Sequence, residues 1–552
     1  MIQHLLQKLI IAFHFSIGNR IGDHSRIFPS FEKTAIKYLI QKKNVVHMFV
    51  IFVFILLIGQ IGSSQILTKK QPNIILFLVD DMGWMDTSVP FGDSVTANNR
   101  KYHTPNMQKL ADEGVRFTNA YVNPVCTPTR TSILCGLSAV RTHITNWTNT
   151  PPNQHTDHPD SILQFPAWNI NGLSPKPHEN AFQATPFTEI LKNEGYFTIH
   201  VGKAHWGSQS TPGSDPLNFG FLTNVGGTSI GHPQSYYGKN NFGNKAGSIT
   251  HWAIPGLQEF YDKDVFLTEA LTQKAIQLMS GSIGQQKPFF LNFGHYAIHT
   301  PIQPDHRYFE KYLLNGLDST EAAYASLVEG MDKSLGDIMH FLKSQNQEDN
   351  TIIIFLSDNG GLTNSSRGGT RNTHNHPLRS GKGSVYEGGI KVPMIVKWPK
   401  MVRSGTKTSH QMMAEDIFPT ILEMAGAKFT AAKIDGKSLV PALKSPVYKG
   451  SLRNLIFHYP HRWTKNEDEG IAWASALRRG DWKVVYLMKE QKLELYNIAK
   501  DPGEKVNLAD TYPEQVTALA QIMGDELRSK NAQMPLWKKS GKQVAWPDQL
   551  EK

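Results

Sequence analysis

Four short apolar segments, each followed closely by charged or metal-ligating side chains, constrain the fold of this chain most. They are residues 73–79 (NIILFLV), 196–201 (YFTIHV), 288–293 (PFFLNF) and 351–356 (TIIIFL). Their length and their β-branched and aromatic content favour buried strands. Helical patterns lie between them at residues 105–113, 188–194 and 319–345. Strands that alternate with helices predict an α/β fold with a large mixed, mostly parallel sheet flanked by helices.

The sequence pattern changes near residue 445. Beyond it come short strand-like segments at residues 454–459, 472–478, 482–487 and 493–497, followed by a helical segment at 513–530. This pattern predicts a smaller antiparallel-sheet subdomain. We therefore expect a catalytic domain at residues 71–445 and a C-terminal subdomain at 446–552, with the polar tail from residue 538 lying at the periphery.

Residues 48–64 have the layout of a secretory signal peptide, because two lysines precede an apolar run and three small residues end it. The run is short for a membrane span, although an uncleaved anchor is the alternative. Residues 1–47 resemble no domain, and we interpret them as an extension upstream of a true start at Met48. The sequence thus predicts an exported protein, periplasmic or secreted, without a stable membrane anchor.

Charge and cysteine usage narrow the function further. The formal net charge is +10, and half of it lies in residues 1–64. The remaining excess suits a polyanionic substrate as well as a solvated basic surface, and together with export it gives nucleic-acid binding little support. Both cysteines, Cys126 and Cys135, lie in one short stretch where a disulfide would close only a tiny loop. At least one of them is therefore expected to have a chemical role.

Hard oxygen donors follow two of the predicted strands. Asp80 and Asp81 come after the first, and Asp358 and Asn359 after the last. Adjacent carboxylates repel each other in a low dielectric, and a bound cation relieves that repulsion. A donor set of oxygens alone favours Ca²⁺ or Mg²⁺ over zinc. Either pair alone could equally cap a helix or a turn.

The other two strands end in side chains of a different kind. These are Lys203 and His205 after one strand, and His295 and His299 after the other. Ligands of α/β sheets gather beyond the carboxyl ends of the strands. Four such endings at one edge therefore predict an active site.

Residues 125–136 (VCTPTRTSILCG) contain a candidate nucleophile at the start of a predicted helix. The first turn of a helix presents backbone N–H groups that favour an anion, and Arg130 is placed to approach Cys126. A thiolate is a soft nucleophile and a poor match for a hard cation. An oxygen nucleophile in place of the Cys126 thiol would fit such a site better.

The pentapeptide CTPTR at residues 126–130 resembles the formylglycine signature of type I sulfatases, which have the alkaline-phosphatase-like fold. Five further segments resemble this family in its own order. They are residues 73–84 (NIILFLVDDMGW), 202–207 (GKAHWG), 356–361 (LSDNGG), 378–393 (LRSGKGSVYEGGIKVP) and 493–508 (LELYNIAKDPGEKVNL). The resemblance runs from about Pro72 to Ala509. Lys391 departs from the family, in which arginine is commoner, and we expect a structural role for it.

The resemblance implies a cofactor and a modified residue. A formylglycine-generating maturation enzyme would oxidise Cys126 to formylglycine (3-oxoalanine), whose hydrate is a geminal diol. One Ca²⁺ ion would be ligated by Asp80, Asp81, Asp358, Asn359 and the modified Cys126. The choice between Ca²⁺ and Mg²⁺ stays open at this stage.

The resemblance also implies a role for each remaining site residue. Arg130 would hold the diol, and Lys203 and Lys382 would bind the sulfate group. His299 would act as general acid towards the leaving oxygen. His205 would help to deprotonate the remaining diol hydroxyl, which expels sulfate and restores the aldehyde.

Two other functions remain as alternatives. One is a phosphate or phosphonate ester hydrolase of the same superfamily, although a phosphate monoester usually demands a second metal and the sequence shows one set of carboxylates. The other is a non-catalytic glycan-binding protein, which would be expected to have lost catalytic residues that this chain retains.

A sulfated polysaccharide or oligosaccharide, algal or host-derived, is the expected substrate. The loop at residues 367–379 is rich in histidine and arginine, and aromatic residues lie around Tyr459 and Trp463. Further candidate substrate contacts, to which no catalytic role is assigned, are His295, Arg371, His374, His376 and Arg379.

Overall fold

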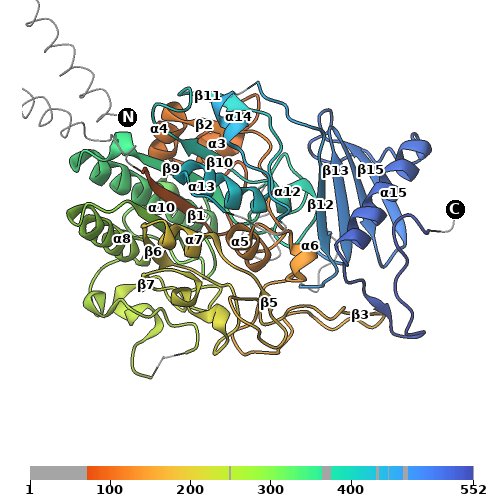
Figure 1. The fold of residues 1–552 in the computed structure, drawn as a ribbon, viewed down its shortest axis with the longest axis horizontal. Coiled ribbons are helices and arrows are strands. Elements are labelled where there is room, and N and C mark those ends of the chain that lie inside the picture. Colours follow the sequence, from red (N-terminus) through yellow and green to blue (C-terminus); the bar gives the residue numbers. More distant parts are fainter. Residues whose placement is uncertain are drawn as a thin grey trace, which may run out of the picture. The chain divides into compact units, whose positions relative to one another are not determined.

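An eight-stranded sheet forms the centre of the molecule, in the order β11-β2-β10-β9-β1-β8-β6-β7 (Figure 1). Its strands are β1 (Asn73–Val79), β2 (Val115–Phe117), β6 (Phe197–Gly202), β7 (Thr223–Val225), β8 (Phe289–Gly294), β9 (Thr351–Ser357), β10 (Met394–Lys397) and β11 (Thr406–Thr408). Strand β10 runs antiparallel to its neighbours β2 and β9, and the other neighbouring pairs are parallel. The predicted mixed, mostly parallel sheet is therefore confirmed.

The computed structural model describes residues 71–247, 250–363, 375–429, 434–445, 447–463 and 470–550. The predicted signal peptide at residues 48–64 and the extension at 1–47 lie outside this part of the chain. Within the described residues, no helix combines the length and the apolar character that crossing a membrane requires.

Helices cover both faces of the central sheet, because alternate side chains of β1 enter two different hydrophobic cores. Ile75, Phe77 and Val79 pack with helices on one face, and Ile74, Leu76 and Leu78 with helices on the other. The first face carries α4 (Pro105–Glu113), α8 (Leu267–Gly284), α9 (Phe309–Leu314) and α10 (Ser319–Ser344). The second carries α5 (Cys126–Cys135), α7 (Phe187–Asn193), α13 (Ile417–Ala425) and α14 (Val440–Lys444).

Shorter elements complete the catalytic part. They are α3 (Ala97–Lys101), α6 (Ala139–Thr142), α12 (Glu387–Ile390), β3 (Leu163–Gln164), β4 (Leu173–Ser174), β5 (Phe182–Gln183) and several 3-10 turns, including η3 (Gly238–Gly243). The predicted strands and helices agree with the structure, and their ends differ by at most two residues. Continuous apolar runs predict the strands of the central sheet correctly, because these strands are buried on both faces.

A four-stranded antiparallel sheet follows towards the C-terminus, as predicted. It consists of β12 (Asn454–Tyr459), β13 (Ala474–Arg479), β14 (Trp482–Leu487) and β15 (Lys492–Asn497), with α15 (Pro513–Ser529) against one face. This part is blue in Figure 1 and shares one compact unit with the catalytic part. Its other face packs on Val385, Tyr386 and Ile390 of the segment that carries Lys382.

The C-terminal tail is not peripheral, so that expectation is wrong. Val544 is fully buried and joins the core under α15, and Trp546 packs against the same core. The Tyr486 hydroxyl donates to the carbonyl oxygen of Ala545 at 2.7 Å, and β16 (Leu536–Trp537) pairs with β3. Residues 544–550 are thus packed against the C-terminal part of the fold, whereas residues 538–543 are exposed.

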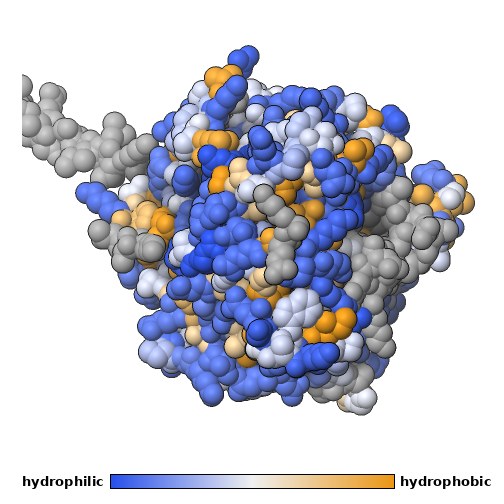
Figure 2. Space-filling view, turned by 90° about the vertical axis from the view of Figure 1, so that its right-hand side faces the viewer, coloured by the Kyte–Doolittle hydropathy of each residue, from blue (hydrophilic) through white to orange (hydrophobic). Residues whose placement is uncertain are grey.

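The surface on the side of the C-terminal sheet is mostly hydrophilic. In the part that the structure describes, its hydrophobic residues lie in small scattered groups (Figure 2). Single hydrophobic residues of this kind are normal on a soluble surface.

Candidate active site

The four predicted strand ends meet at one edge of the sheet. Strands β6, β8, β1 and β9 are adjacent and parallel, so their carboxyl ends lie side by side. Asp80 and Asp81 follow β1, and Asp358 and Asn359 follow β9. All four side chains are completely buried. The sheet therefore brings three carboxylates and an amide into an interior where they need compensation.

Three buried oxygens at this edge have no hydrogen-bond partner among the described residues. They are Asp80 Oδ1, Asp81 Oδ2 and Asn359 Oδ1. Ligand atoms of Asp80, Asp81 and His299 also lie within 4.8 Å of one another. Unpaired buried oxygens are costly, and hard oxygen ligands are those that Ca²⁺ and Mg²⁺ prefer. The residues present thus fit a bound divalent cation.

The two carboxylates Asp80 and Asp358 differ in their electrostatic environment. Burial, and then the negative charge of Asp358, raise the pKa of Asp80 well above its ordinary value, although Lys203 opposes this effect. Burial would also raise the pKa of Asp358, but Arg130, Lys203 and Lys382 together lower it. Without a cation, Asp80 is the carboxylate whose negative charge is least well compensated.

Three cationic side chains, all buried, surround the carboxylates. Arg130 Nε donates to Asp358 Oδ2 at 2.7 Å, and Arg130 Nη1 donates to the carbonyl oxygen of Lys203 at 3.0 Å. Lys203 Nζ lies 2.7 Å from Asp80 Oδ2, and Lys382 Nζ lies 2.6 Å from Asp81 Oδ1. These cations are the kind of groups that bind an anionic ester next to a metal ion.

Cys126 lies at the first turn of α5, beside His205. The distance from Cys126 Sγ to His205 Nδ1 is 3.4 Å. His205 Nε2 lies 2.9 Å from the carbonyl oxygen of Thr148, which can only accept, so Nε2 carries the hydrogen. In the neutral ring Nδ1 is therefore a bare acceptor that faces Cys126. Burial, and then Lys203, lower the pKa of His205 well below its ordinary value, which keeps the ring neutral.

His299 lies beside Lys382 and Asp81. Its Nε2 lies 3.0 Å from Lys382 Nζ and 3.5 Å from Asp81 Oδ2. Its Nδ1 lies 3.1 Å from the carbonyl oxygen of Thr300, to which it donates. Lys382 can therefore donate to Nε2, and His299 and Lys382 together hold a proton at one point of the site.

Other residues singled out from the sequence have different surroundings. His295 is fully buried, contacts the rings of Phe77 and Phe293, and lies 3.2 Å from Ser334 Oγ, as a core histidine does. Lys391 is buried with its Nζ 4.2 Å from the ring centroid of Trp84. This contact agrees with a structural role for Lys391.

The remaining candidate substrate contacts divide into three groups. Arg379 stacks 3.8 Å over the ring of Tyr386 and donates to the Tyr496 hydroxyl, whereas His376 is exposed. Of the two aromatic residues expected near a glycan, Tyr459 is buried in the core beneath the C-terminal sheet, whereas Trp463 is half-buried with its ring centroid 5.6 Å from Lys382 Nζ. Arg371 and His374 lie outside the described residues.

Sequence reasoning missed two residues that act on the site histidines. The carbonyl of Thr148 sets the tautomer of His205, and the ring of His232 stacks on His299. A backbone carbonyl leaves no mark in a sequence, and His232 is one of 22 histidines. Only a long-range contact distinguishes it from the others.

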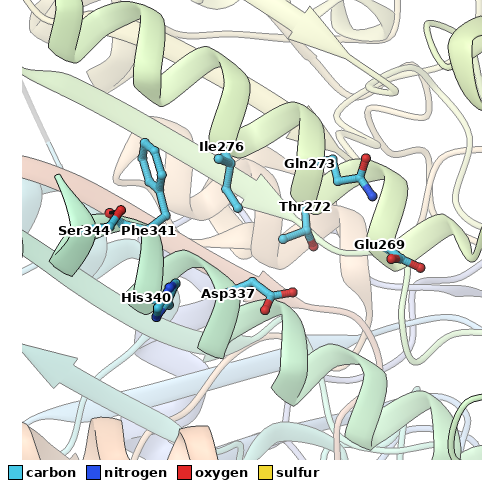
Figure 3. A pocket seen from close by; sticks show the side chains of 8 residues that line it. All are labelled: Glu269, Thr272, Gln273, Ile276, Asp337, His340, Phe341 and Ser344. Carbon is cyan, nitrogen blue, oxygen red and sulfur yellow. Dashed lines mark hydrogen bonds between the residues drawn. The ribbon is translucent and has the colours of Figure 1, made fainter.

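A cavity of about 320 Å³ lies away from this site, between α8 and α10 (Figure 3). Side chains of these two helices line it, among them Glu269, Ile276, Asp337 and Phe341. None of the residues that follow the four strands contributes to its lining. The cavity is therefore separate from the candidate active site at the sheet edge.

The fold is that of the alkaline-phosphatase-like class, and its sheet edge brings oxygen donors and buried cationic side chains beside a buried cysteine. Residues 72–427 match the family model described as Sulfatase, and residues 380–533 match that of N-sulphoglucosamine sulphohydrolase, C-terminal. The first match spans more than half of the chain. The chain therefore belongs to the sulfatase family and is a sulfuric ester hydrolase.

Individual relatives agree with this assignment over most of their length. A sulfatase of Formosa agariphila is 29% identical, with 90% of this chain and 96% of that protein covered. The N-acetylgalactosamine-6-sulfatase of Homo sapiens is also 29% identical, with 86% and 88% covered. The crystal structure of Ps i-CgsB has a TM-score of 0.64 and 28% identity, covering 83% of this chain and 93% of that one, and it has also been solved in complex with k-i-k-neocarrahexaose.

Proposed function

We propose that this sulfatase hydrolyses sulfate esters of a sulfated polysaccharide or oligosaccharide, with formylglycine at position 126 and one bound Ca²⁺. The observation that carries the proposal is the set of three unpaired buried oxygens beside the Cys126–His205 pair and three buried cations. Two of the relatives named above, the N-acetylgalactosamine-6-sulfatase and Ps i-CgsB, are named for a sugar or were solved with one, and this favours a glycan over a small aryl or steroid sulfate.

Conversion of Cys126 is supported by its environment. Burial is the largest influence on the Cys126 thiol and raises its pKa, although Lys203 and Lys382 act in the opposite direction. An unmodified Cys126 would thus be a protonated thiol and a weak nucleophile. A hydrated aldehyde at the same position would instead present oxygens to the cation and a hydroxyl to His205 Nδ1.

A single Ca²⁺ would act as a Lewis acid that draws charge from a sulfate oxygen, and Asp80, Asp81, Asp358 and Asn359 would hold it. Lys203 and Lys382 would bind the remaining sulfate oxygens as charge develops on them. A hydroxyl oxygen of the hydrated aldehyde at position 126 would form a bond to sulfur, while the proton held between Lys382 and His299 would pass to the alcohol oxygen whose bond to sulfur breaks. His205 Nδ1 would then take the proton of the other hydroxyl of the hydrate, so that the bond from the residue 126 carbon to the sulfate oxygen breaks and the aldehyde forms again.

The choice between sulfate and phosphate esters rests on the metal site. The described residues offer one group of carboxylates, and a doubly charged phosphate monoester usually requires a second metal.

We also propose that the mature enzyme is exported, with a catalytic domain at residues 71–445 and a C-terminal subdomain at 446–552.

Two measurements test the proposed function. After co-expression with a formylglycine-generating enzyme, mass spectrometry of the Cys126 peptide is expected to show the aldehyde. The same protein is expected to release sulfate from 4-nitrophenyl sulfate and from sulfated glycans. A higher kcat/KM for 4-nitrophenyl phosphate would favour the phosphate hydrolase instead. An unmodified thiol in a protein that binds glycans without releasing sulfate would favour the glycan-binding alternative.

A further inference from the structure

One segment, residues 226–237 between β7 and η3, contacts both histidines of the site. On the side of His205, the backbone N–H of His205 donates to the carbonyl oxygen of Thr228 at 3.0 Å. Gly231 lies directly against the imidazole, because a Cβ at this position would come within 2.7 Å of His205 Cε1. Only glycine leaves the His205 ring in its present place.

On the side of His299, the contact is a stack of rings. The His232 and His299 rings are nearly parallel, with centroids 5.7 Å apart and an interplanar angle of 11°. Trp252 stacks on His232 at 4.2 Å and 19°. His232 Nδ1 lies 3.1 Å from the carbonyl oxygen of Pro233, to which it donates. His232 is thus held by its own backbone and by Trp252 while it supports His299.

The same segment also holds the backbone that carries His299. The buried hydroxyl of Tyr236 lies 2.7 Å from the carbonyl oxygen of Tyr296 and 2.9 Å from that of His299. The backbone N–H of Tyr236 donates to Gln303 Oε1 at 2.7 Å. Both the ring and the main chain of His299 are therefore attached to one short segment.

We propose that residues 226–237 form a positioning element for the two site histidines. His232 is a positioning residue for His299, and Gly231 is a positioning residue for His205. The inference rests on the proposed function, in which His299 protonates the leaving oxygen and His205 acts at residue 126. Polar partners fix the edges of the His299 ring, and the stack on His232 limits its tilt. The rate of proton transfer falls steeply when the donor is misplaced, so this support matters for catalysis.

The two positions predict opposite kinetic signatures. Protonation of the leaving oxygen matters most for a poorly acidic alcohol and least for an acidic phenol. His232→Ala is therefore expected to make kcat/KM fall more steeply as the phenol of an aryl sulfate becomes less acidic. His205 acts at residue 126 after the alcohol has left, so Gly231→Ala is expected to lower kcat and to leave the slope of kcat/KM along the series unchanged.

The experiment measures kcat/KM for a series of aryl sulfates from 4-nitrophenyl to 4-methoxyphenyl sulfate. His232→Ala is expected to lower kcat/KM about 10–100-fold for 4-methoxyphenyl sulfate, which has the least acidic phenol, and least for 4-nitrophenyl sulfate. His232→Phe keeps an aromatic ring and is expected to restore most of the loss. Adding His232→Ala to His299→Ala is expected to cost little more, because both act through the same proton transfer.

His306 provides the matched control, because its ring stacks on Tyr237 of the same segment at 5.3 Å. His306→Ala is expected to leave both the rates and the slope of the series unchanged. A Tm equal to that of the parent protein, measured once with Ca²⁺ and once without it, verifies that each variant is folded.

Each remaining outcome separates the inference from the proposed function. The positioning role is refuted if His232→Ala lowers kcat/KM by the same factor for every substrate, or lowers it for none. It is also refuted if the losses from His232→Ala and His299→Ala add fully in the double variant. In each case the sulfatase assignment stands. If the parent protein itself releases no sulfate from any substrate, the proposed function fails and the inference falls with it.

Discussion

Two clusters of buried charge in this molecule have opposite characters. The site cluster consists of Asp80, Asp81, Asp358, Arg130, Lys203 and Lys382 at the edge of the central sheet. The junction cluster consists of Tyr121, Glu387, Arg478, Lys483 and Glu504, between the catalytic part and the C-terminal sheet. Both are almost inaccessible to water, and both balance their formal charges.

The clusters differ in whether their oxygens are used. In the junction cluster, Glu387 Oε1 lies 3.1 Å from Lys483 Nζ, and Glu387 Oε2 accepts from the Tyr121 hydroxyl at 2.7 Å and from Arg478 Nη1 at 3.3 Å. Glu504 Oε2 accepts from the backbone N–H of Glu387. Glu504 Oε1 forms an ion pair with Lys483 Nζ at 2.8 Å.

At the sheet edge, Asp80 Oδ1, Asp81 Oδ2 and the neighbouring Asn359 Oδ1 have no hydrogen-bond partner among the described residues. The first two have only longer contacts, 4.0 Å to Arg130 Nη2 and 3.5 Å to His299 Nε2. An unpaired buried oxygen destabilises a fold unless a ligand completes it, whereas a paired network needs nothing further. Buried charge alone therefore does not identify a functional site. What distinguishes the sheet edge is that several unpaired buried oxygens lie close together, whereas among the described residues of the junction cluster Glu504 Oε1 alone lacks a hydrogen bond and it keeps a close ion pair with Lys483.

The largest expected effect is on activity, from a change in the site that spares the fold. Cys126→Ala is expected to lower kcat/KM for 4-nitrophenyl sulfate by about 10⁴-fold or more, since it removes the nucleophile. Cys135→Ala is the control, because Cys135 is buried in the same helix but packs in the core away from the site. It is expected to keep full activity and to lose about 1 kcal/mol of stability. Equal activity in the parent and Cys126→Ala would remove the basis of the proposed mechanism.

In the junction cluster the expected loss is in stability. Lys483→Met leaves Glu387 and Glu504 buried without their shared cation, and is expected to cost about 3–5 kcal/mol in urea unfolding. The folded fraction should keep the parent's kcat. Lys333→Met removes an exposed pair with Asp337 and is expected to change stability by less than about 0.5 kcal/mol. A large loss of kcat in folded Lys483→Met would show that the junction takes part in catalysis.

Metal binding should stabilise the site cluster and leave the junction cluster unaffected. Adding Ca²⁺ to metal-free protein at 100 times its Kd is expected to raise the free energy of unfolding by about 2.7 kcal/mol. The rise should persist in Lys483→Met and vanish in Asp81→Asn. A response to Mg²⁺ in place of Ca²⁺ would change the identity of the ion. A lack of response to both ions would contradict a metal site.

A further expected effect is a pH dependence of the junction cluster. Burial is the main cause that raises the pKa of Glu504 to about 7 from its ordinary value of 4.5, and Lys483 opposes it. The folded protein thus holds this proton more tightly than the unfolded chain does. The free energy of unfolding therefore falls as the pH rises from about 4.5 to about 7. Glu504→Gln should flatten this part of the profile, and an unchanged slope in urea titrations would contradict the assignment.

Much of the fold and of the site follows from local patterns. Strand β1 has its predicted bounds because an apolar run buried on both faces leaves few alternatives. The convergence of Asp80, Lys203, His299 and Asp358 follows from the rule that parallel strands end at one edge. The fate of Tyr459 could not be predicted in this way, since β12 is covered on both faces and its residues have no outward side.

The sequence by itself determined the order of strands and helices, the candidate nucleophile and the residues that follow each strand. Each of these depends on neighbours within a few positions. Only the tertiary structure decided which buried oxygens stay unpaired, which nitrogen of His205 faces Cys126, and that His232 and Gly231 support the two histidines. These properties arise from contacts between residues far apart in the chain. A displacement of about one ångström is enough to form or break such a contact, and local sequence does not determine distances to that precision.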